Sequence, residues 1–376
     1  MAQFTIATRG SDLALTQCSH VAHSLRSQGL DVQIKVITTY GDTSKESLTQ
    51  MGGIGVFVAR IRQALLDEQC DLAVHSFKDL PTTPVDGLTI GAIPERADCR
   101  DALCARDGLS LRQLPEGSTI GTGSPRRAAQ LLALRPDLHI VDIRGNVPTR
   151  LGRVQGNKFD GVNCQNDLDA VILAKAGLDR LGLGTYITDT FGPERLLPAA
   201  AQGALAVECR SADLATNTLL RAVLSAIDHE PTRLEVLAER AVMSTLQAGC
   251  AAPVGTWAKT AFFDPSPVHS EISEGEAVAC LDDGETSHAP TRLADDVGQP
   301  PRHNNKASHP GLGLDAAVVA IDGTRSVSSM QATMIDKDLP LSEKQVLAQQ
   351  LGQAVGEELI ELGAATITDL QATKKR

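Results

Sequence analysis

The sequence predicts an α/β protein with largely parallel sheets. Short apolar, strand-like runs alternate with segments of helical periodicity from the N-terminus to about residue 240, which is typical of this class. Apolar residues make up 42% of the chain and charged residues 22%, an ordinary globular composition that argues against a disordered or fibrous chain. At roughly 150 residues per domain, 376 residues correspond to two or three domains.

The elements of the first two thirds of the chain follow from apolar spacing. Residues 4–8 form an apolar and β-branched run, and the apolar residues of 12–26 recur at helical spacing behind Ser11, a favourable N-cap. A glycine-punctuated loop precedes the helical pattern of 56–66. Further strands are expected at residues 32–38, 71–75, 118–121, 139–142, 169–173 and 204–208, with helices in the gaps.

Composition changes sharply near residue 264. A helix at 235–246 and a strand near Thr256 precede the change. Residues 264–311 are rich in Pro, Gly, His, Ser and acidic residues with weak periodicity, so we expect a mostly irregular surface insertion in which only 277–281 could form a strand. Regular patterning returns with strands at 314–320 and 329–335 and a helix at 342–363.

The charge balance restricts the classes of partner. The formal net charge is −11 and aromatic residues are 3% of the chain, so we expect neither nucleic acid nor an anionic membrane as a partner. No apolar run approaches the roughly 18 residues of a membrane span and no export segment is evident, which predicts a cytoplasmic location. The eight cysteines are expected to be reduced thiols, and their spacing does not predict a metal site.

The stretch Gly121–Arg127 (GTGSPRR) is the most informative local motif. It resembles a dinucleotide-binding fingerprint, but Arg126 stands where the third glycine is needed. Ser124 can cap a helix that begins at Pro125, which places Arg126 and Arg127 in the first turn, where the helix dipole disfavours cations. We therefore expect a carboxylate or phosphate beside them, the alternative being a pair of solvated arginines. Unpartnered cations there contribute little to the helix, so replacing them should affect ligand binding more than stability.

Positively charged residues recur just after the predicted strands. Because ligands of open α/β sheets bind at the carboxyl ends of strands, these charges can face one crevice. Asp79 adds a carboxylate that could pair with a neighbouring cation or stabilise a developing positive charge. His75 is expected to be a hydrogen-bonded core histidine. The cations in question are Arg9, Lys78, Arg144, Arg150 and Arg153.

Cys250 differs from the other cysteines in its surroundings. It lies among glycine and small residues in the loop 247–255, so its thiol is expected to be sterically open, whereas Cys209 lies in an apolar strand and is expected to be inert. No local pattern supplies the histidine that a cysteine nucleophile needs. Covalent attachment of a cofactor at Cys250 is therefore a serious alternative to hydrolytic catalysis.

Taken together, these motifs resemble those of the porphobilinogen deaminase family. The resemblance covers residues 4–258, and the motifs occur in the family's order. They are Ala7–Ser11 with Leu13–Leu15 and Gln17, Val74–Pro81, Gly121–Arg127, Arg144–Val147 with Thr149–Leu151, Leu173–Ala174 with Ala176–Leu178 and Arg180–Gly182, Pro198–Ala199 with Gln202–Ala204, and Glu239–Ala241 leading to Gly249–Cys250.

The resemblance implies two related, doubly wound α/β lobes, like those of two-lobed solute-binding proteins, and a third small α/β domain. The chain would cross between the lobes near 96–100 and return near 196–198. The implied divisions are residues 1–97 with 198–218 for the first lobe, 98–197 for the second, and 219–376 for the cofactor-cysteine domain, which contains the insertion at 264–311.

The activity implied by the resemblance is that of a transferase of tetrapyrrole (haem and porphyrin) biosynthesis. Such an enzyme deaminates four porphobilinogen molecules, joins them head to tail on a dipyrromethane primer and releases hydroxymethylbilane by hydrolysis. Cys250 matches the cysteine that holds the primer through a thioether, and Asp79 matches the residue that would stabilise positive charge developing on the pyrroles. The acetate and propionate of porphobilinogen would explain an arginine-rich crevice in an acidic monomer. The implied cofactor contacts are Ser11, Lys78, Thr122, Ser124, Arg126, Arg127 and Arg144, and the implied substrate contacts are Arg9, Arg144, Arg150 and Arg180.

The chain departs from the family pattern in two places. Many relatives carry lysine in the glycine-rich loop where this chain has Ile54 and Ala59, so a basic lid is not implied there, although Arg60 could substitute in part. The insertion at 264–311 has no counterpart in the family pattern. The rival hypothesis is a non-catalytic, anion-binding protein of the two-lobed solute-binding class, against which Cys250 and the missing export segment argue.

Overall fold

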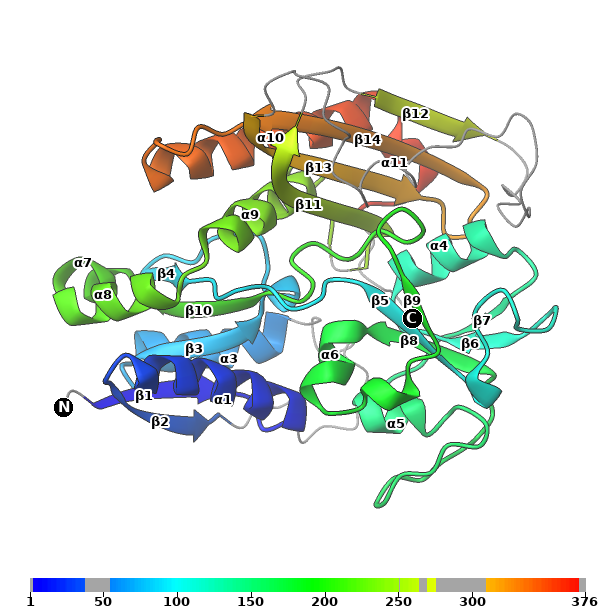
Figure 1. Cartoon of the computed structure of the whole chain (residues 1–376), viewed down its shortest axis with the longest axis horizontal. Coiled ribbons are helices and arrows are strands. Elements are labelled where there is room, and N and C mark those ends of the chain that lie inside the picture. The colour runs from blue at the N-terminus through cyan, green and yellow to red at the C-terminus, as the bar shows by residue number, and fades with distance from the viewer. Residues whose placement is uncertain (1–2, 38–54, 250, 264–268, 275–308, 372–376) are drawn as a thin grey trace.

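Three β-sheets flanked by helices make up the fold (Figure 1). The computed structural model describes residues 3–37, 55–249, 251–263, 269–274 and 309–371. Two sheets have five strands each, and the C-terminal sheet has four. The predicted α/β class with a third small sheet domain is confirmed.

The first five-stranded sheet combines strands from both ends of the first two thirds of the chain. Its elements are β1 (Gln3–Thr8), α1 (Asp12–Ser27), β2 (Asp31–Val36), α3 (Gly55–Leu66), β3 (Leu72–Ser76), β4 (Leu88–Ala92), β10 (Leu205–Arg210), α7 (Ser211–Thr216) and α8 (Thr218–Ile227). The strand order is β2-β1-β3-β10-β4, with β10 returning from the second sheet to lie between β3 and β4. Ser11 caps α1 as expected, because its hydroxyl accepts a hydrogen bond from the Ala14 amide at 3.4 Å.

The second five-stranded sheet is continuous in sequence. Its elements are β5 (Asp101–Ala105), β6 (Thr119–Gly121), α4 (Pro125–Leu134), β7 (His139–Val141), α5 (Val147–Leu151), β8 (Ala170–Ala174), α6 (Lys175–Arg180) and β9 (Asp189–Phe191). The strand order is β7-β6-β8-β5-β9, which repeats the pattern of the first sheet, namely three parallel strands followed by antiparallel pairings. Helix α4 starts where the sequence predicts, with Ser124 as N-cap and Pro125 in the first turn.

The third sheet is antiparallel throughout and packs one face on two long helices (Figure 1). Its elements are α9 (Glu230–Thr245), β11 (Val254–Phe263), β12 (His269–Glu274), β13 (His309–Val319), β14 (Arg325–Met334), α10 (Leu341–Glu361) and α11 (Ala364–Ile367). The strand order is β11-β13-β14-β12. Alternate residues of β13, Leu312 to Val318, are buried against α9 and α10. Among the described residues, no helix is long and apolar enough to cross a bilayer.

Two predictions about the sheets are wrong. The five-stranded sheets are mixed rather than largely parallel, because β5, by which the chain enters the second sheet, and β10, by which it returns to the first, both pair antiparallel to their neighbours. Apolar runs carry no information about strand direction. Strands β4, β5 and β9 lie in gaps that were assigned to helices, since strands such as β9, with the sequence DTF, are too short to show a period.

The expectation of a mostly irregular insertion at 264–311 is wrong for residues 269–274 and 309–311, which form strands. Strand β12 lies inside it and pairs with β14 at the sheet edge, and β13 begins at His309 rather than at 314. The sequence of β12, HSEISE, is mostly polar and therefore lacked the apolar period that predicts a strand. The segment 277–281 lies outside the described residues.

Two segments connect the five-stranded sheets and run side by side. Residues 93–100 lead from β4 to β5, and residues 192–204 return from β9 to β10. The Ala97 amide donates a hydrogen bond to the Gly203 carbonyl at 3.3 Å. A Cβ on Gly203, whose φ is +87°, would come within 2.4 Å of the Ala97 oxygen, so this close approach requires glycine.

A buried carboxylate joins both crossing segments to the third sheet. Glu239 of α9 is fully buried and accepts hydrogen bonds from the Arg96 guanidinium at 2.7 and 3.0 Å, from the Ala201 amide at 2.6 Å and from the Ala258 amide at 2.9 Å. Its partners lie in the first crossing (residues 93–100), in the return crossing (residues 192–204) and in β11. One side chain therefore connects both crossings to the third sheet through satisfied polar contacts.

Candidate active site

The charged residues predicted from strand ends are brought together from both five-stranded sheets. Lys78 and Asp79 lie in the 3-10 turn that follows β3. The charge on Lys78 is influenced by Arg127 at the start of α4, and the charge on Arg150 in α5 is influenced by both Arg127 and Asp79. These four charged groups therefore lie close enough to influence one another's charge, and the expectation that strand ends bring them to one shared crevice stays a prediction.

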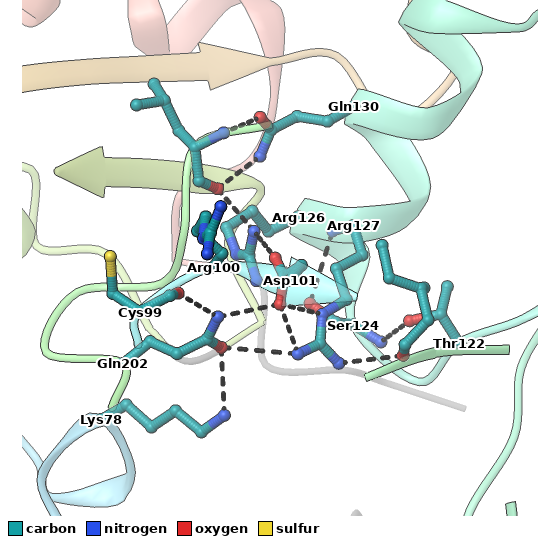
Figure 2. Close-up of polar contacts among 12 residues, drawn as sticks. Lys78, Cys99, Arg100, Asp101, Thr122, Ser124, Arg126, Arg127, Gln130 and Gln202 are labelled. Atoms are coloured by element: carbon teal, nitrogen blue, oxygen red, sulfur yellow. Dashed lines mark hydrogen bonds and ion pairs between the residues drawn. The ribbon is translucent and has the colours of Figure 1, made fainter. Parts of the chain in front are cut away.

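Arg126 and Arg127 are buried and share one carboxylate, that of Asp101 (Figure 2). Arg127 donates from Nε and Nη2 to Asp101 Oδ1 at 3.0 and 2.7 Å, and Arg126 Nη1 lies 2.8 Å from Oδ2. Burial alone would raise the pKa of Asp101, but the two guanidinium groups outweigh burial and hold that pKa well below its usual range. Asp101 is thus an anion in the folded protein.

This arrangement corrects the alternative of solvated arginines. The two residues are only 4% and 6% exposed, and the chain itself supplies a carboxylate beside them. Since two guanidinium groups face one Asp101, one positive charge is not balanced by that carboxylate. Arg126 Nη1 also donates to the Leu197 carbonyl at 2.5 Å, which connects α4 to the return crossing.

The side-chain amide of Gln202 lies between Lys78 and the cluster formed by Asp101, Arg126 and Arg127 (Figure 2). Its Oε1 accepts hydrogen bonds from Lys78 Nζ at 3.2 Å and from Arg127 Nη2 at 3.4 Å. Its Nε2 donates to the Cys99 carbonyl at 2.7 Å and to Asp101 Oδ1 at 2.8 Å. Gln202 is fully buried and uses both donors and both acceptor sites.

Two of these cations, Lys78 and Arg150, have lowered pKa values. Burial, followed by the nearby Arg127, lowers the pKa of Lys78 to about 8. Burial, followed by Arg127 and Arg144, also lowers the pKa of Arg150. Burial is the larger cause of both shifts, and the part due to Arg127 shows that Lys78 and Arg150 lie in its positive potential, which favours an anionic ligand.

Asp79 is the carboxylate of this crevice. It is half-buried, and its charge partly offsets the positive potential at Lys78 and Arg150. Its carboxylate forms no hydrogen bond or ion pair with any residue that the structure describes. It is therefore open to the N–H groups of a ligand.

The two hydroxyls of the Gly121–Arg127 motif have structural partners. Thr122 Oγ1 accepts a hydrogen bond from the Ser124 amide at 3.2 Å, and Ser124 Oγ accepts one from the Arg127 amide at 3.4 Å. Both hydroxyls retain a proton that can be donated to an anion. The turn that starts α4 is thus held in place by the residues expected to contact the cofactor.

The remaining predicted arginines differ in their surroundings. Arg9 directly follows β1 and is half-buried, and Arg144 is exposed with Nη2 3.7 Å from Asp142 Oδ2. Arg180 donates from Nη2 to the Gly203 carbonyl at 2.7 Å, so it supports the return crossing. Arg153 forms a two-point ion pair with Asp167 at 2.5 and 2.6 Å, which compensates its charge locally.

Two expectations about single residues are confirmed. His75 is buried, and its Nε2 lies 3.1 Å from Glu208 Oε2, as expected for a hydrogen-bonded core histidine. Cys209 is buried, and burial raises the pKa of its thiol to about 11, as expected for an inert cysteine. Cys250 and Ile54 lie outside the described residues. In the described part of the chain, no group of three or more His, Cys, Asp or Glu side chains is placed to hold a metal ion.

Sequence reasoning missed Asp101, Gln202 and Glu239 as parts of this region. Gln202 and Glu239 each begin one of the family motifs, Gln202–Ala204 and Glu239–Ala241, but the sequence assigns neither residue a role. Asp101 carried no such indication, because its partners are 25 and 26 residues away in sequence. Only the fold brings β5 beside the first turn of α4.

Comparison with known proteins agrees with this geometry. The family model "Porphobilinogen deaminase, dipyromethane cofactor binding domain" matches residues 4–218, and "Porphobilinogen deaminase, C-terminal domain" matches residues 233–264. The chain belongs to the porphobilinogen deaminase family. The porphobilinogen deaminase of Cutibacterium acnes is 48% identical over 376 residues and 99% of both chains. That of Thermobifida fusca is 42% identical over 363 residues, covering 96% of this chain and 94% of the relative.

Family membership establishes the activity and the cofactor of the protein. As a family member, the chain is a transferase of tetrapyrrole biosynthesis that acts on porphobilinogen with a dipyrromethane cofactor. Among solved structures, a periplasmic substrate-binding protein from Coxiella burnetii is similar over 61% of this chain and 93% of that chain, at 18% identity and a TM-score of 0.37. A likeness this distant adds nothing to the assignment.

Proposed function

We propose that the crevice between the two five-stranded sheets is the site where the porphobilinogen deaminase reaction takes place, with Asp79 as its catalytic residue. The observation that carries the proposal is that Lys78, from the first sheet, and Arg150, from the second, both lie in the field of Asp79, whose carboxylate has no partner among the described residues. The cofactor contacts in this proposal are Ser11, Lys78, Thr122, Ser124, Arg126, Arg127 and Arg144, with Cys250 as the attachment point, and the substrate contacts are Arg9, Arg144, Arg150 and Arg180.

The residues present fit a dipyrromethane. Two arginines against one Asp101, together with Lys78 and Arg150, leave an excess of positive charge, and Arg127 adds to the effect of burial in lowering the pKa values of Lys78 and Arg150. Pyrroles that carry acetate and propionate groups supply the matching negative charge. When bound, the cofactor supplies an electron-rich pyrrole end to which substrate units are added.

The chain's own residues have separate tasks in this reaction. The cations bind and orient carboxylates, which leaves the ring N–H groups free to face Asp79. Asp79 would accept hydrogen bonds from those N–H groups and stabilise positive charge that develops on the rings. Cys250 would hold the cofactor through a thioether and so keep the growing chain attached.

The domain division is part of the proposal. Residues 1–97 with 198–218 form the first lobe, 98–197 the second, and 219–376 the cofactor-cysteine domain. Sheet membership supports these limits, because β10 joins the first sheet while the strands from Asp101 to Phe191 form the second. We further propose that the enzyme acts in the cytoplasm as a monomer, and the net charge of −11 supports a function without nucleic acid.

The intact mass of the purified protein tests the proposal. The chain should be heavier than its sequence by one dipyrromethane, and Cys250→Ser should lose this increment because a hydroxyl is a much weaker nucleophile than a thiolate. Cys164→Ser, a change at a cysteine that is only partly buried, should keep it. Ehrlich's reagent, which colours free-ended dipyrroles, gives a second readout. A fully active protein with unmodified Cys250 would rule out the assignment, and a protein that binds anions without turnover would favour the solute-binding hypothesis.

A further inference from the structure

Gln202 occupies a turn whose shape is fixed by its neighbours. Ala201 and Gly203, on either side, both have positive φ values, +61° and +87°. The left-handed region is costly for alanine, and the Ala201 amide is held there by its 2.6 Å hydrogen bond to Glu239. Gly203 is pressed against Ala97 of the first crossing. The side chain of Gln202 is therefore presented in one direction by a constrained backbone.

The four contacts of Gln202 come from three different parts of the fold. Lys78 belongs to the turn after β3 in the first sheet, Arg127 and Asp101 belong to the second sheet and its helix α4, and the Cys99 carbonyl belongs to the first crossing (Figure 2). A neutral amide is suited to this position because its oxygen faces two cations while its nitrogen faces two acceptors. An apolar side chain would leave all four groups without this partner.

We propose that Gln202 is a positioning residue of this enzyme: its amide holds the Lys78 ammonium and the Arg127 guanidinium at a fixed separation, so that cations from both lobes bind the carboxylates of one pyrrole chain. The inference rests on the proposed function, since it concerns how the same crevice binds its ligand. Gln202 does not touch the reacting atoms. It acts through Lys78 and Arg127, whose mutual repulsion its shared oxygen offsets.

The titration of Lys78 reports on this role directly. The charged groups that act on Lys78 are Arg127 and Arg126 from α4, Asp101 from β5 and Asp79 from its own turn. Gln202→Met removes the oxygen that stabilises the ammonium, so the pKa of Lys78 should fall by about one unit. Gln202→Glu places a carboxylate at the same position, so that pKa should rise by a similar amount.

The matched control is the chain's other buried glutamine on the same cluster. Gln130 of α4 is 8% exposed and exchanges two hydrogen bonds with the Leu197 backbone, at 3.1 and 2.7 Å, without touching Lys78 or Arg127. Gln130→Met makes the same chemical change at a similar depth. It should leave the titration of Lys78 unchanged.

The experiment uses the full chain with three readouts. Competitive labelling of lysines with acetic anhydride over pH 6–10, followed by peptide mass spectrometry, gives the midpoint for Lys78. Intact mass gives cofactor loading, and turnover of porphobilinogen gives KM and kcat. We expect opposite shifts of the Lys78 midpoint in Gln202→Met and Gln202→Glu, no shift in Gln130→Met, and a KM for Gln202→Met raised at least about 10-fold with a smaller change in kcat.

Each possible result of this experiment either supports or overturns the proposed role of Gln202. A Lys78 midpoint that is the same in wild type and both Gln202 variants would overturn the inference, as would an equal shift in Gln130→Met. If Gln202→Met does not fold, Gln202→Glu decides alone: an upward shift with altered KM supports the role, and an unshifted midpoint refutes it. If the wild type carries no dipyrromethane but the Lys78 midpoint still shifts in the Gln202 variants, the proposed function is wrong. The contacts of Gln202 to Lys78 and Arg127 then have only a structural role.

Discussion

Replacement of Asp101 by alanine tests the charge balance on which the proposed site depends. Asp101 is fully buried and is the shared carboxylate of Arg126 and Arg127, with Gln202 Nε2 as a further donor at 2.8 Å. Asp101→Ala leaves two buried guanidinium groups without this counter-charge. The sequence alone gave the opposite expectation for this cluster, namely little effect on stability, because it showed no partner for the arginines.

The expected cost is about 3–5 kcal/mol of unfolding free energy, the range for removing one partner of a buried ion pair. The pKa of Asp101 is lowered on folding, so this contribution is complete above about pH 4, the value for an unfolded aspartate, and is lost only as pH falls further. A control is Asp179→Ala, which removes a 42% exposed partner of Lys175 on α6 and should cost less than about 1 kcal/mol.

Urea unfolding at pH 7, followed by circular dichroism, measures both variants. The lost stability should be partly restored by cofactor, because ligand carboxylates can replace the missing counter-charge. Asp101→Ala should therefore lower the unfolding midpoint more in a Cys250→Ser background than in the cofactor-loaded protein. Equal midpoints for Asp101→Ala and Asp179→Ala would show that Asp101 is not the essential counter-ion, and an equal loss in both backgrounds would remove Arg126 and Arg127 from the cofactor site.

Three further predictions follow from the same structure. Asp79→Asn should keep its fold and slow turnover at least ~100-fold, measured by product formation, whereas Asp86→Asn, an exposed change seven residues later, should leave turnover unchanged. Asp315 has a buried oxygen without a hydrogen-bond partner among the described residues, and burial raises its pKa to about 6. A carboxyl whose pKa rises on folding costs stability progressively between about pH 4 and 6 and in full above that, so Asp315→Asn should stabilise the chain by roughly 2–3 kcal/mol above pH 7 and by little near pH 4 in urea unfolding at both pH values. Replacing all of 264–311 by a short Gly/Ser turn removes β12 and exposes the edge of β14, so it should reduce the solubility of the protein. A deletion confined to 275–308 keeps β12 and should not reduce solubility. Equal solubility of the two variants would show that β12 is not part of the stable sheet.

The fold class and most regular elements could be predicted because local patterns determine them. The caps at Ser11 and Ser124, the periodicity of α1 and the apolar runs of β1, β3 and β8 are all local features. Strand direction was not predictable in this way. Whether β10 runs parallel or antiparallel to β3 depends on the path of the chain through the second sheet, which no window around Leu205–Arg210 contains.

The sequence predicts which positively charged residues belong to the candidate site, but it does not predict which residues pair with them. Arg126, Arg127 and Lys78 stand out because cations are unusual at a helix start and at strand ends. Asp101 and Gln202 do not stand out, since an aspartate and a glutamine in ordinary segments are common. Their importance comes from burial beside those cations, which only the tertiary structure shows.

The crossing segments and the anion site are one physical network. Asp101 is the first residue of β5, directly after the first crossing, and Gln202 and Leu197 lie in the return crossing. All three contact the arginines at the start of α4. In the proposed division Gln202 belongs to the first lobe, whereas Asp101 and Arg127 belong to the second, so we expect a rotation of one lobe against the other to stretch the contacts of Gln202 to these two residues. If ligand carboxylates bind Arg127 as proposed, their binding should therefore be coupled to the angle between the lobes through these contacts.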